Sequence, residues 1–297
     1  MRRRGCEGFV LVSVLGALIV LTGLAAAVAY LVRTAVLGAA VARSELETDA
    51  LTRSGLEIAG FELFELKRPA SAVNGQQVRL DAGVVTLFVS AESGRIDLNS
   101  APPETLASLW ASIGASGLTP EQFAARVKDY RDADSEPEEK GGAERAQYQA
   151  VAPDRQPADA PFELIDDVQH VLGVTPDAAR LLAPLITVHN PGGKVSVYDA
   201  PPEVIRAMPN GATLVDRIMT LRARPPATGD EAEEADKAAE EALGDAAKLF
   251  SFERTSAAYT VRVEVARPDT RRSLTAILTR SRSSDALYFV TDLIDGP

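Results

Sequence analysis

One uncharged, apolar stretch dominates the N-terminal part of the chain. No charged residue lies between Glu7 and Arg33, and the segment Gly8–Val32 consists mostly of Val, Leu, Ala and Gly. A helix of about 20 such residues crosses the hydrocarbon core of a bilayer. Arginines occupy positions 2–4 and little basic charge follows the stretch directly, so the positive-inside rule places the N-terminus in the cytoplasm. The sequence predicts a single membrane span that anchors a large exported domain.

Beyond this span the apolar spacing stays helical and then changes to the alternation typical of strands. Apolar residues three and four positions apart continue to about Lys67, and Pro69 is expected to end the helix. Residues 77–80 and 83–90 are rich in strand formers and predict a hairpin. Three further strand-like runs lie near the C-terminus, at 259–265, 274–279 and 286–291.

Two stretches between these strand-forming segments repeat the same pattern. Residues 94–106 and 193–205 each combine a short strand-like run, an Ala-Pro-Pro-Glu sequence and an apolar-spaced helix. Ser100 and Asp199 stand two positions before the first proline and are expected to cap that helix. Further helices are predicted at 119–130, 163–172, 175–182 and 213–222.

Strand-forming segments therefore flank a helical region, which predicts one sheet that is split in the sequence. The predicted fold class is α+β, with a long N-terminal helix packed on an antiparallel sheet and a large inserted all-α domain. The predicted parts are a leader at 1–8, the N-terminal helix at 9–67, the first part of the β domain at 68–93, the helical domain at 94–225, an acidic linker at 226–250 and the rest of the β domain at 251–297.

Composition narrows the possible functions. The net charge of -11 disfavours nucleic-acid binding, which depends largely on neutralising phosphates. Cys6 is the only cysteine, so an intramolecular disulfide is impossible, and two histidines leave little material for a zinc site. The acidic, Ala-rich stretch 229–244 has little to bury and is expected to be a solvated helix or a disordered insertion.

The densest group of carboxylates follows the helix predicted at 119–130. It begins at Asp129, continues through Asp132 and Asp134, and ends at Glu144. Carboxylates in a loop are the hard oxygen ligands that Ca²⁺ prefers. A solvated acidic loop and a catalytic carboxylate pair are the alternatives, although no second constellation of residues supports catalysis.

The N-terminus admits three interpretations that differ in where the chain is cut. A secretory signal peptide would be cut after Ala27-Val28-Ala29, but the apolar run is longer than usual. A lipoprotein signal fails because no apolar segment precedes Cys6. A prepilin-like leader would be cut between Gly8 and Phe9 and would keep the apolar helix.

In this last case the chain resembles type IV pilin-like proteins, with one departure. The fifth residue of the mature chain would be Ser13, where that family normally has a Glu that offsets the N-terminal charge of a neighbouring subunit. Lack of this carboxylate is a property of the K-type minor pseudopilins of the type II secretion system, general secretion pathway protein K. The segments that carry the resemblance to that family are Gly8–Leu15, Asp97–Ala101, Asp129–Asp134, Gly142–Glu144, Tyr148, Pro161–Leu164 and Asp199–Pro201.

The resemblance implies a non-enzymatic structural role. A prepilin peptidase would cleave before Phe9, which would become methylated, and the helix would hold the protein in the bacterial inner membrane with its C-terminal domain in the periplasm. The I-type and J-type minor pseudopilins, the major pseudopilin and the inner-membrane secretion platform are the implied partners. The protein would initiate the pseudopilus and cap its tip. Calcium is bound in the globular region of that family, and the implied ligands are Asp132, Asp134 and Glu144, with Asp129 as a weaker candidate.

Two other functions remain as alternatives. The repeat, with its Leu-x-x-Leu spacing and glycine turns, is similar to the helix-hairpin-helix modules of exported DNA-binding proteins, although few basic residues lie near the turns. A membrane-anchored periplasmic enzyme is a more distant alternative, because no nucleophile elbow, metalloprotease helix or phosphate-binding glycine loop is present in the sequence.

Overall fold

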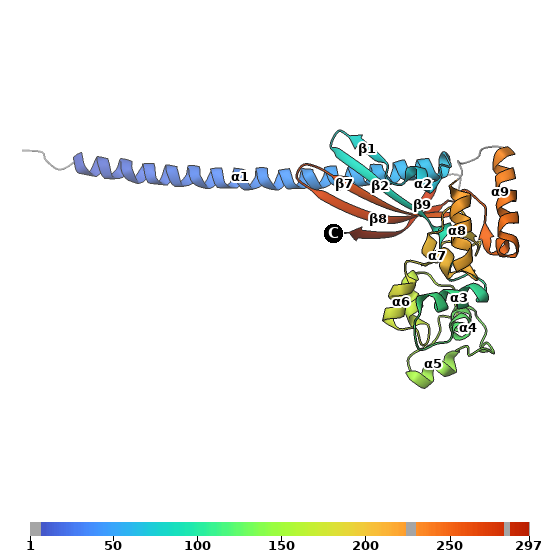
Figure 1. Cartoon of the computed structure of the whole chain (residues 1–297). Coiled ribbons are helices and arrows are strands. Elements are labelled where there is room, and N and C mark those ends of the chain that lie inside the picture. The colour runs from blue at the N-terminus through green and yellow to red at the C-terminus, as the bar shows by residue number, and fades with distance from the viewer. Residues whose placement is uncertain (1–6, 224–229, 282–285, 297) are drawn as a thin grey trace, which may run out of the picture.

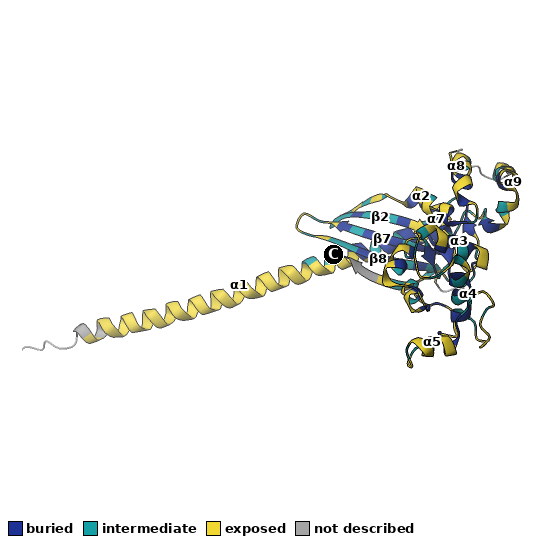
Figure 2. Cartoon of the chain, turned by 60° about the horizontal axis from the view of Figure 1, so that its bottom comes forward, coloured by how far each residue is buried: buried dark blue, intermediate teal, exposed yellow. Residues whose placement is uncertain are grey.

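The computed structural model describes residues 7–223, 230–281 and 286–296. Its first element is the helix α1, Glu7–Gly60, which runs on into a π-helical turn at Phe61–Glu65. The N-terminal half of α1 projects away from the rest of the chain, and the side chains described there are exposed (Figures 1 and 2). Its apolar part is long enough to cross a membrane, and no other helix in the described residues meets this test. The predicted leader lies mostly outside the described residues.

A five-stranded antiparallel sheet packs against the C-terminal half of α1. Its strands are β1 (Gln77–Leu80), β2 (Gly83–Ala91), β7 (Ala258–Ala266), β8 (Arg271–Arg280) and β9 (Tyr288–Gly296), in this order across the sheet. The short helix α2, Ala70–Val73, leads into it. The predicted hairpin and all three C-terminal runs are strands, and the neighbouring strands β2 and β7 come from opposite ends of the chain that follows α1.

Alternating apolar residues of the sheet form one core with α1. Every second residue of β7 from Tyr259 to Val265 points inward and is buried. These side chains meet the buried face of α1 and the π-helical turn after it: α1 contributes Leu51, Leu56 and Ala59, and the turn contributes Leu63 and Phe64. At the tip of the β7–β8 hairpin, Arg267 donates a hydrogen bond to the carbonyl oxygen of Ser44 (2.6 Å) and pairs with Glu47. This contact ties the sheet to the middle of α1.

The chain between β2 and β7 forms a second, mostly helical core. Trp110 stacks on Phe123 and Tyr130 on Phe162, with ring centroids 4.6 Å and 4.7 Å apart. The helices are α3 (Pro103–Ile113), α4 (Pro120–Arg131), α5 (Arg145–Val151), α6 (Pro176–Leu182), α7 (Pro202–Ala207), α8 (Gly211–Arg222) and α9 (Asp230–Leu243). The 3-10 turns are Glu92–Gly94, Ile165–His170 and Gly244–Leu249, and the two-residue strands are β3 (Ile96–Asp97), β4 (Ile186–Thr187), β5 (Val195–Ser196) and β6 (Phe250–Ser251).

The internal repeat is present in three dimensions. β3 pairs in parallel with β4, and β5 pairs in the same way with β6. In each copy an arginine at the end of the second helix donates to the carbonyl of the residue after the first strand: Arg131 to Leu98, and Arg222 to Val197. The two copies therefore share a framework that reaches beyond the sequence similarity.

The expected capping roles of Ser100 and Asp199 are wrong. Pro102 and Pro201 occupy the cap positions of α3 and α7, and neither helix has a side-chain cap. Instead the Ser100 hydroxyl donates to Asp97 (3.0 Å), and in the second copy the Ser196 hydroxyl donates to Asp199 (3.0 Å). A serine–aspartate hydrogen bond thus closes the turn before the helix in both copies. The aspartate comes first in the chain in the first copy, and the serine comes first in the second.

Two other expectations for the helical region need correction. The helix expected at 163–172 is a 3-10 turn at Ile165–His170, and α5 was not predicted. The acidic linker expected at 226–250 is not separate: α9 buries Ala239 and Leu243, and Leu249 and Phe250 belong to the second core. Arg254 pairs with Asp236 of α9 (2.7 Å), which holds the acidic helix against the repeat. Residues 226–229 lie outside the described residues.

A buried carboxylate joins the two cores. Glu92, which is fully buried, accepts hydrogen bonds from Thr187 of β4 (2.5 Å) and Thr260 of β7 (2.6 Å), and pairs with Arg95 (3.2 Å). The sheet and the helical region are therefore connected by a satisfied polar network and not only by the chain.

The turn between α7 and α8 leaves no room for a side chain. A Cβ atom at Gly211 would lie 1.9 Å from the carbonyl oxygen of Ile205. We expect Gly211→Ala to lower the free energy of unfolding of this core by about 3 kcal/mol. Urea unfolding followed by the fluorescence of Trp110, the single tryptophan, measures this. Gly192→Ala is the control, because its Cβ would only make an ordinary 3.8 Å contact, and an equal loss in both variants would contradict the argument.

Candidate metal centre and membrane anchor

Three carboxylates meet where the loop after α4 returns to α5. Asp132 ends α4 through a backbone hydrogen bond to Lys128 (3.0 Å), Asp134 lies in the loop and Glu144 directly precedes α5. One oxygen from each carboxylate lies within 4.8 Å of the others. The structure thus brings together three of the four residues expected to bind calcium.

The donor atoms of this cluster fit a hard cation. Asp132 Oδ1 and Glu144 Oε1 are buried and have no hydrogen-bond partner. Asp134 is exposed, and its Oδ1 accepts a hydrogen bond from the amide of Glu136 (2.9 Å). Buried carboxylate oxygens without donors are costly unless a cation or water satisfies them. The three residues therefore suit a calcium ion that is open to solvent on the Asp134 side.

Asp129 has a different role from the other three carboxylates. It is fully buried and accepts hydrogen bonds from the amide of Glu138, at 3.3 Å to each of its oxygens. A Cβ atom at Gly142 would lie 2.1 Å from Asp129 Oδ2, so only glycine lets the loop approach this closely. Asp129 organises the loop that carries the cluster, whereas Asp132, Asp134 and Glu144 face the candidate site.

Basic residues hold the same loop from outside the cluster. Arg126 of α4 donates to the carbonyl oxygens of Gly141 (3.1 Å) and Leu172 (2.7 Å), and Lys128 pairs with Glu138. No sequence motif marked Arg126. Its position three residues before Asp129 on α4 is the signal that could have linked it to the loop.

Burial and mutual repulsion disfavour the charged forms of the carboxyl groups in this cluster. Burial, followed by the charges of Asp129 and Asp132, raises the pKa of Glu144 to about 7. Burial and then the charge of Asp134 raise the pKa of Asp132, and burial raises the pKa of Asp129 despite its backbone hydrogen bonds. A proton or a cation relieves this repulsion.

The raised pKa of Glu144 predicts how stability depends on pH without calcium. The folded state holds the Glu144 proton more tightly than the unfolded state, in which the pKa is near 4.5. Stability should therefore rise as the pH falls from about 7 towards 4.5, by up to about 3 kcal/mol from this residue. Thermal unfolding of the full chain in detergent with a chelator measures it, and saturating calcium should flatten the profile.

The variant Glu144→Gln separates this effect from any stabilisation of the fold at low pH that other residues cause. In a chelator above neutral pH it should unfold at a higher temperature than the unmodified chain, because the buried charge is gone. It should also lose that part of the pH dependence. A lower unfolding temperature for Glu144→Gln under these conditions would show that the carboxylate stabilises the fold without a cation.

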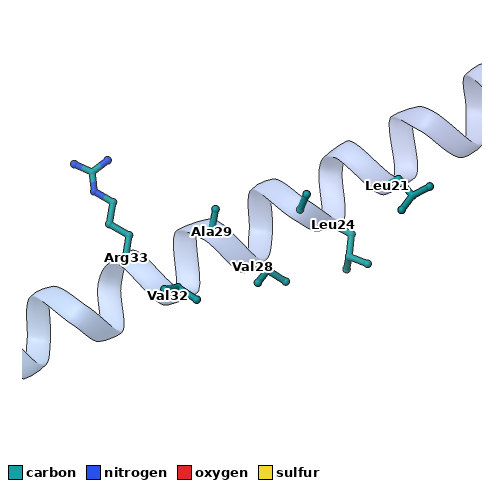
Figure 3. A pocket seen from close by; sticks show the side chains of 7 residues that line it. Leu21, Leu24, Val28, Ala29, Val32 and Arg33 are labelled. Atoms are coloured by element: carbon teal, nitrogen blue, oxygen red, sulfur yellow. The ribbon is translucent and has the colours of Figure 1, made fainter.

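The membrane anchor presents apolar side chains on all sides. Phe9, the predicted first mature residue, is 78% exposed. Ser13, the position of the missing carboxylate, donates its hydroxyl to the carbonyl oxygen of Phe9 (2.5 Å), so the helix itself satisfies it. The residues Leu21, Leu24, Ala25, Val28, Ala29, Val32 and Arg33 line an open strip along this one helix (Figure 3). Lipid or another apolar helix can cover this strip.

Two motifs that carry the family resemblance contact each other. The amide nitrogen of the Asn99 side chain donates to the carbonyl of Phe162 (2.9 Å), and its oxygen accepts from the Phe162 backbone N–H (2.7 Å). Tyr148 is buried, and its hydroxyl accepts a hydrogen bond from the amide of Leu172 (3.0 Å). These residues hold the first repeat together beside the acidic loop.

Comparisons with known proteins agree with this architecture. Residues 85–191 match a family model described as Type II secretion system (T2SS), protein K. The matched segment runs from β2 to the end of the first repeat and contains the acidic loop with Asp129, Asp132, Asp134 and Glu144. No curated protein matches the sequence significantly.

Among solved structures, the chain is similar to one in the crystal structure of the GspK-GspI-GspJ complex of the type 2 secretion system of enterotoxigenic Escherichia coli. The TM-score is 0.61 at 15% sequence identity, and the alignment covers 86% of this chain and 96% of that chain. The resemblance to the K-type minor pseudopilins that the sequence predicts is confirmed, and so is the pilin-like fold with an added helical domain.

Proposed function

We propose that this chain, which matches type II secretion system protein K in family and fold, is a non-enzymatic minor pseudopilin that initiates a periplasmic pseudopilus and caps its tip. One observation supports the proposal: a helix long and apolar enough to span a membrane is packed on a sheet, and that sheet bears a bulky helical region at the end far from the apolar half of the helix (Figure 1). A subunit stacked above would clash with this region, so the chain fits only at an end of a filament.

The residue at position 13 also supports a position at the end of the filament. A carboxylate there would attract the N-terminal ammonium of a neighbouring subunit inside an apolar bundle, where an unpaired charge is costly. Ser13 is neutral, and its hydroxyl bonds to Phe9. The chain lacks the charge that a repeated subunit needs to receive the next one.

The proposed steps of processing and assembly follow from the N-terminal helix. A prepilin peptidase cleaves between Gly8 and Phe9, and Phe9 is methylated. The helix then holds the chain in the inner membrane, with its C-terminal domain in the periplasm, above the secretion platform. There it joins the I-type and J-type minor pseudopilins before the major pseudopilin extends the filament. The similar Escherichia coli structure, a GspK-GspI-GspJ complex, supports partners of these two types.

Calcium has a structural role in this proposal. Asp132, Asp134 and Glu144 hold the ion, and Asp129 keeps their loop in place. The ion lies beside the first repeat and fixes the connection between α4 and α5. It performs no chemistry there.

Electron microscopy of pseudopili that contain a tagged copy of the chain tests the proposal. Label at one end only, together with fewer pseudopili and less secretion when the chain is deleted, is the expected result. Label along the filament, or unchanged secretion after deletion, would contradict it. A gel-shift assay with the same protein tests the alternative function, and tight salt-sensitive DNA binding would favour the DNA-binding role.

A further inference from the structure

We infer that the outer edge of β9 binds an extended segment of a neighbouring minor pseudopilin that carries apolar and basic side chains; this inference rests on the proposed function. β9 is the last strand of the sheet, and among the described residues no strand pairs with its other side. An edge strand offers a row of backbone donors and acceptors that another strand can use. The backbone therefore favours an extended occupant.

The side chains around β9 are unusually apolar for an exposed edge. Leu287 is 44% exposed, Phe289 51%, Val290 46% and Leu293 57%. Edge strands that face water are generally protected by charges, proline or a covering element. Grouped exposed apolar residues mark an interaction site more often than scattered ones do.

A bulge in β9 places two of these residues on the same side. Val290 pairs with Leu278, but Asp292 pairs with the preceding residue of β8, so one residue of β9 is extra. As a result Val290 and Leu293 both lie on the face of the sheet that turns towards α1. α1 packs over β2 and β7 more than over the far strands, and it leaves the two side chains uncovered.

The position of β9 suits a partner that packs along the membrane helix. Tyr288 lies against Gly60, where a Cβ atom would be 2.2 Å from its ring, and it stacks on Phe64 at 6.0 Å. From there β9 runs back along α1 towards the membrane span (Figure 1). A subunit whose first helix packs beside α1 therefore brings its own globular domain next to this edge.

Charge distinguishes a different protein from a second copy. The segment from 286 to 297 contains Asp292 and Asp295 and no Lys or Arg, and the whole chain has a net charge of -11. Symmetric pairing of two such edges would bring acidic residues together, which is unfavourable. An apolar segment with basic side chains complements the edge.

Site-specific cross-linking tests the surface directly. A photoreactive phenylalanine analogue replaces Phe289 in the full-length chain, which is expressed in membranes with the I-type and J-type minor pseudopilins of the same organism. We expect a cross-link to one of these two partners from position 289. The control is position 181 in α6, where Leu181 is equally exposed at 52% but far from β9 in the chain.

The paired variant Val290→Lys/Leu293→Lys measures the strength of the contact. The amount of partner that co-purifies with this variant should fall at least about tenfold. The amount that co-purifies with Leu181→Lys should equal that of the unmodified chain. Thermal unfolding of the isolated variants should be unchanged, because all three side chains are exposed. A complex that forms normally with the paired variant and gives no cross-link at 289 overturns the inference and leaves the proposed function intact.

Two further outcomes would test the choice of partner and the proposed function. A cross-link at 289 to a second copy of this chain overturns the choice of partner. Failure of the unmodified chain to join either pseudopilin overturns the proposed function, and the inference fails with it.

Discussion

The double variant Asp132→Ala/Asp134→Ala is expected to lose calcium binding while its fold without calcium becomes more stable. The two changes remove negative charge from a cluster in which burial already raises the pKa of Asp132 and Glu144. They also remove two of the three oxygens that converge within 4.8 Å. Calorimetry should show the affinity for Ca²⁺ falling at least about a hundredfold, which corresponds to about 2.7 kcal/mol.

Thermal unfolding of the full chain separates this effect from simple damage. In a chelator the variant should unfold at or above the temperature of the unmodified chain, and added calcium should no longer raise it. The matched control Asp177→Ala/Glu203→Ala removes two exposed carboxylates from α6 and α7 and should keep the calcium response. Unchanged calcium affinity in the Asp132→Ala/Asp134→Ala variant would show that these residues do not bind the ion.

The second large effect is expected at the junction of leader and helix. Gly8→Val should block cleavage before Phe9, so that mass spectrometry of membranes finds only the uncleaved N-terminus. Secretion should fall to background, because a subunit that keeps its basic leader cannot place its helix among others in the apolar bundle. Gly16→Val is the control, since a Cβ atom there meets nothing within 4 Å and the cleavage junction is unchanged.

Two other outcomes would change the interpretation of the anchor. A mature chain that starts near Tyr30, after Ala27-Val28-Ala29, would mean that a signal peptidase removes the helix. A mature chain that starts at Phe9 even when the prepilin peptidase is absent would assign the cleavage to another enzyme. In the expected case the start at methylated Phe9 disappears together with that peptidase.

The sequence predicts those parts of the fold that depend on local pattern. The membrane helix, the hairpin of β1 and β2 and the three C-terminal strands each show a period that a few neighbouring residues define. The sequence predicts one split sheet because strand-forming segments flank a helical region, whereas the pairing of β2 with β7 is seen only in the structure. By contrast, strands of only two residues, such as β3 and β5, pair in parallel with residues far along the chain, and no local pattern encodes that.

The candidate site was predictable to a similar extent. The density of carboxylates between α4 and α5 marks the loop, but spacing alone does not say which side chains converge. Asp129 lies four residues after Ala125 on the buried side of α4, and this helical period distinguishes it from Asp132 and Asp134. The hydrogen bonds of Arg126 to two distant carbonyl groups depend on tertiary packing. The sequence shows only that Arg126 precedes Asp129 by three residues, and not which carbonyl groups it contacts.

The exchanged aspartate and serine also show why a local rule failed. Serine and aspartate before a Pro-Pro pair are typical cap residues, yet in both copies they bond to each other inside the turn. The cap rule considers one helix end, whereas the turn must also satisfy the strand that precedes it.

The polar joint around Glu92 has a mechanical consequence. Arg267 fastens the sheet to the middle of α1, and Glu92 fastens the same sheet to the helical region through Thr187. We therefore expect a push or a twist applied along the membrane helix to pass through the sheet to the helical region, because side-chain hydrogen bonds link each of these parts to the next. In such a transfer, displacement of the helix at the membrane would become displacement of the helical region at the other end of the sheet.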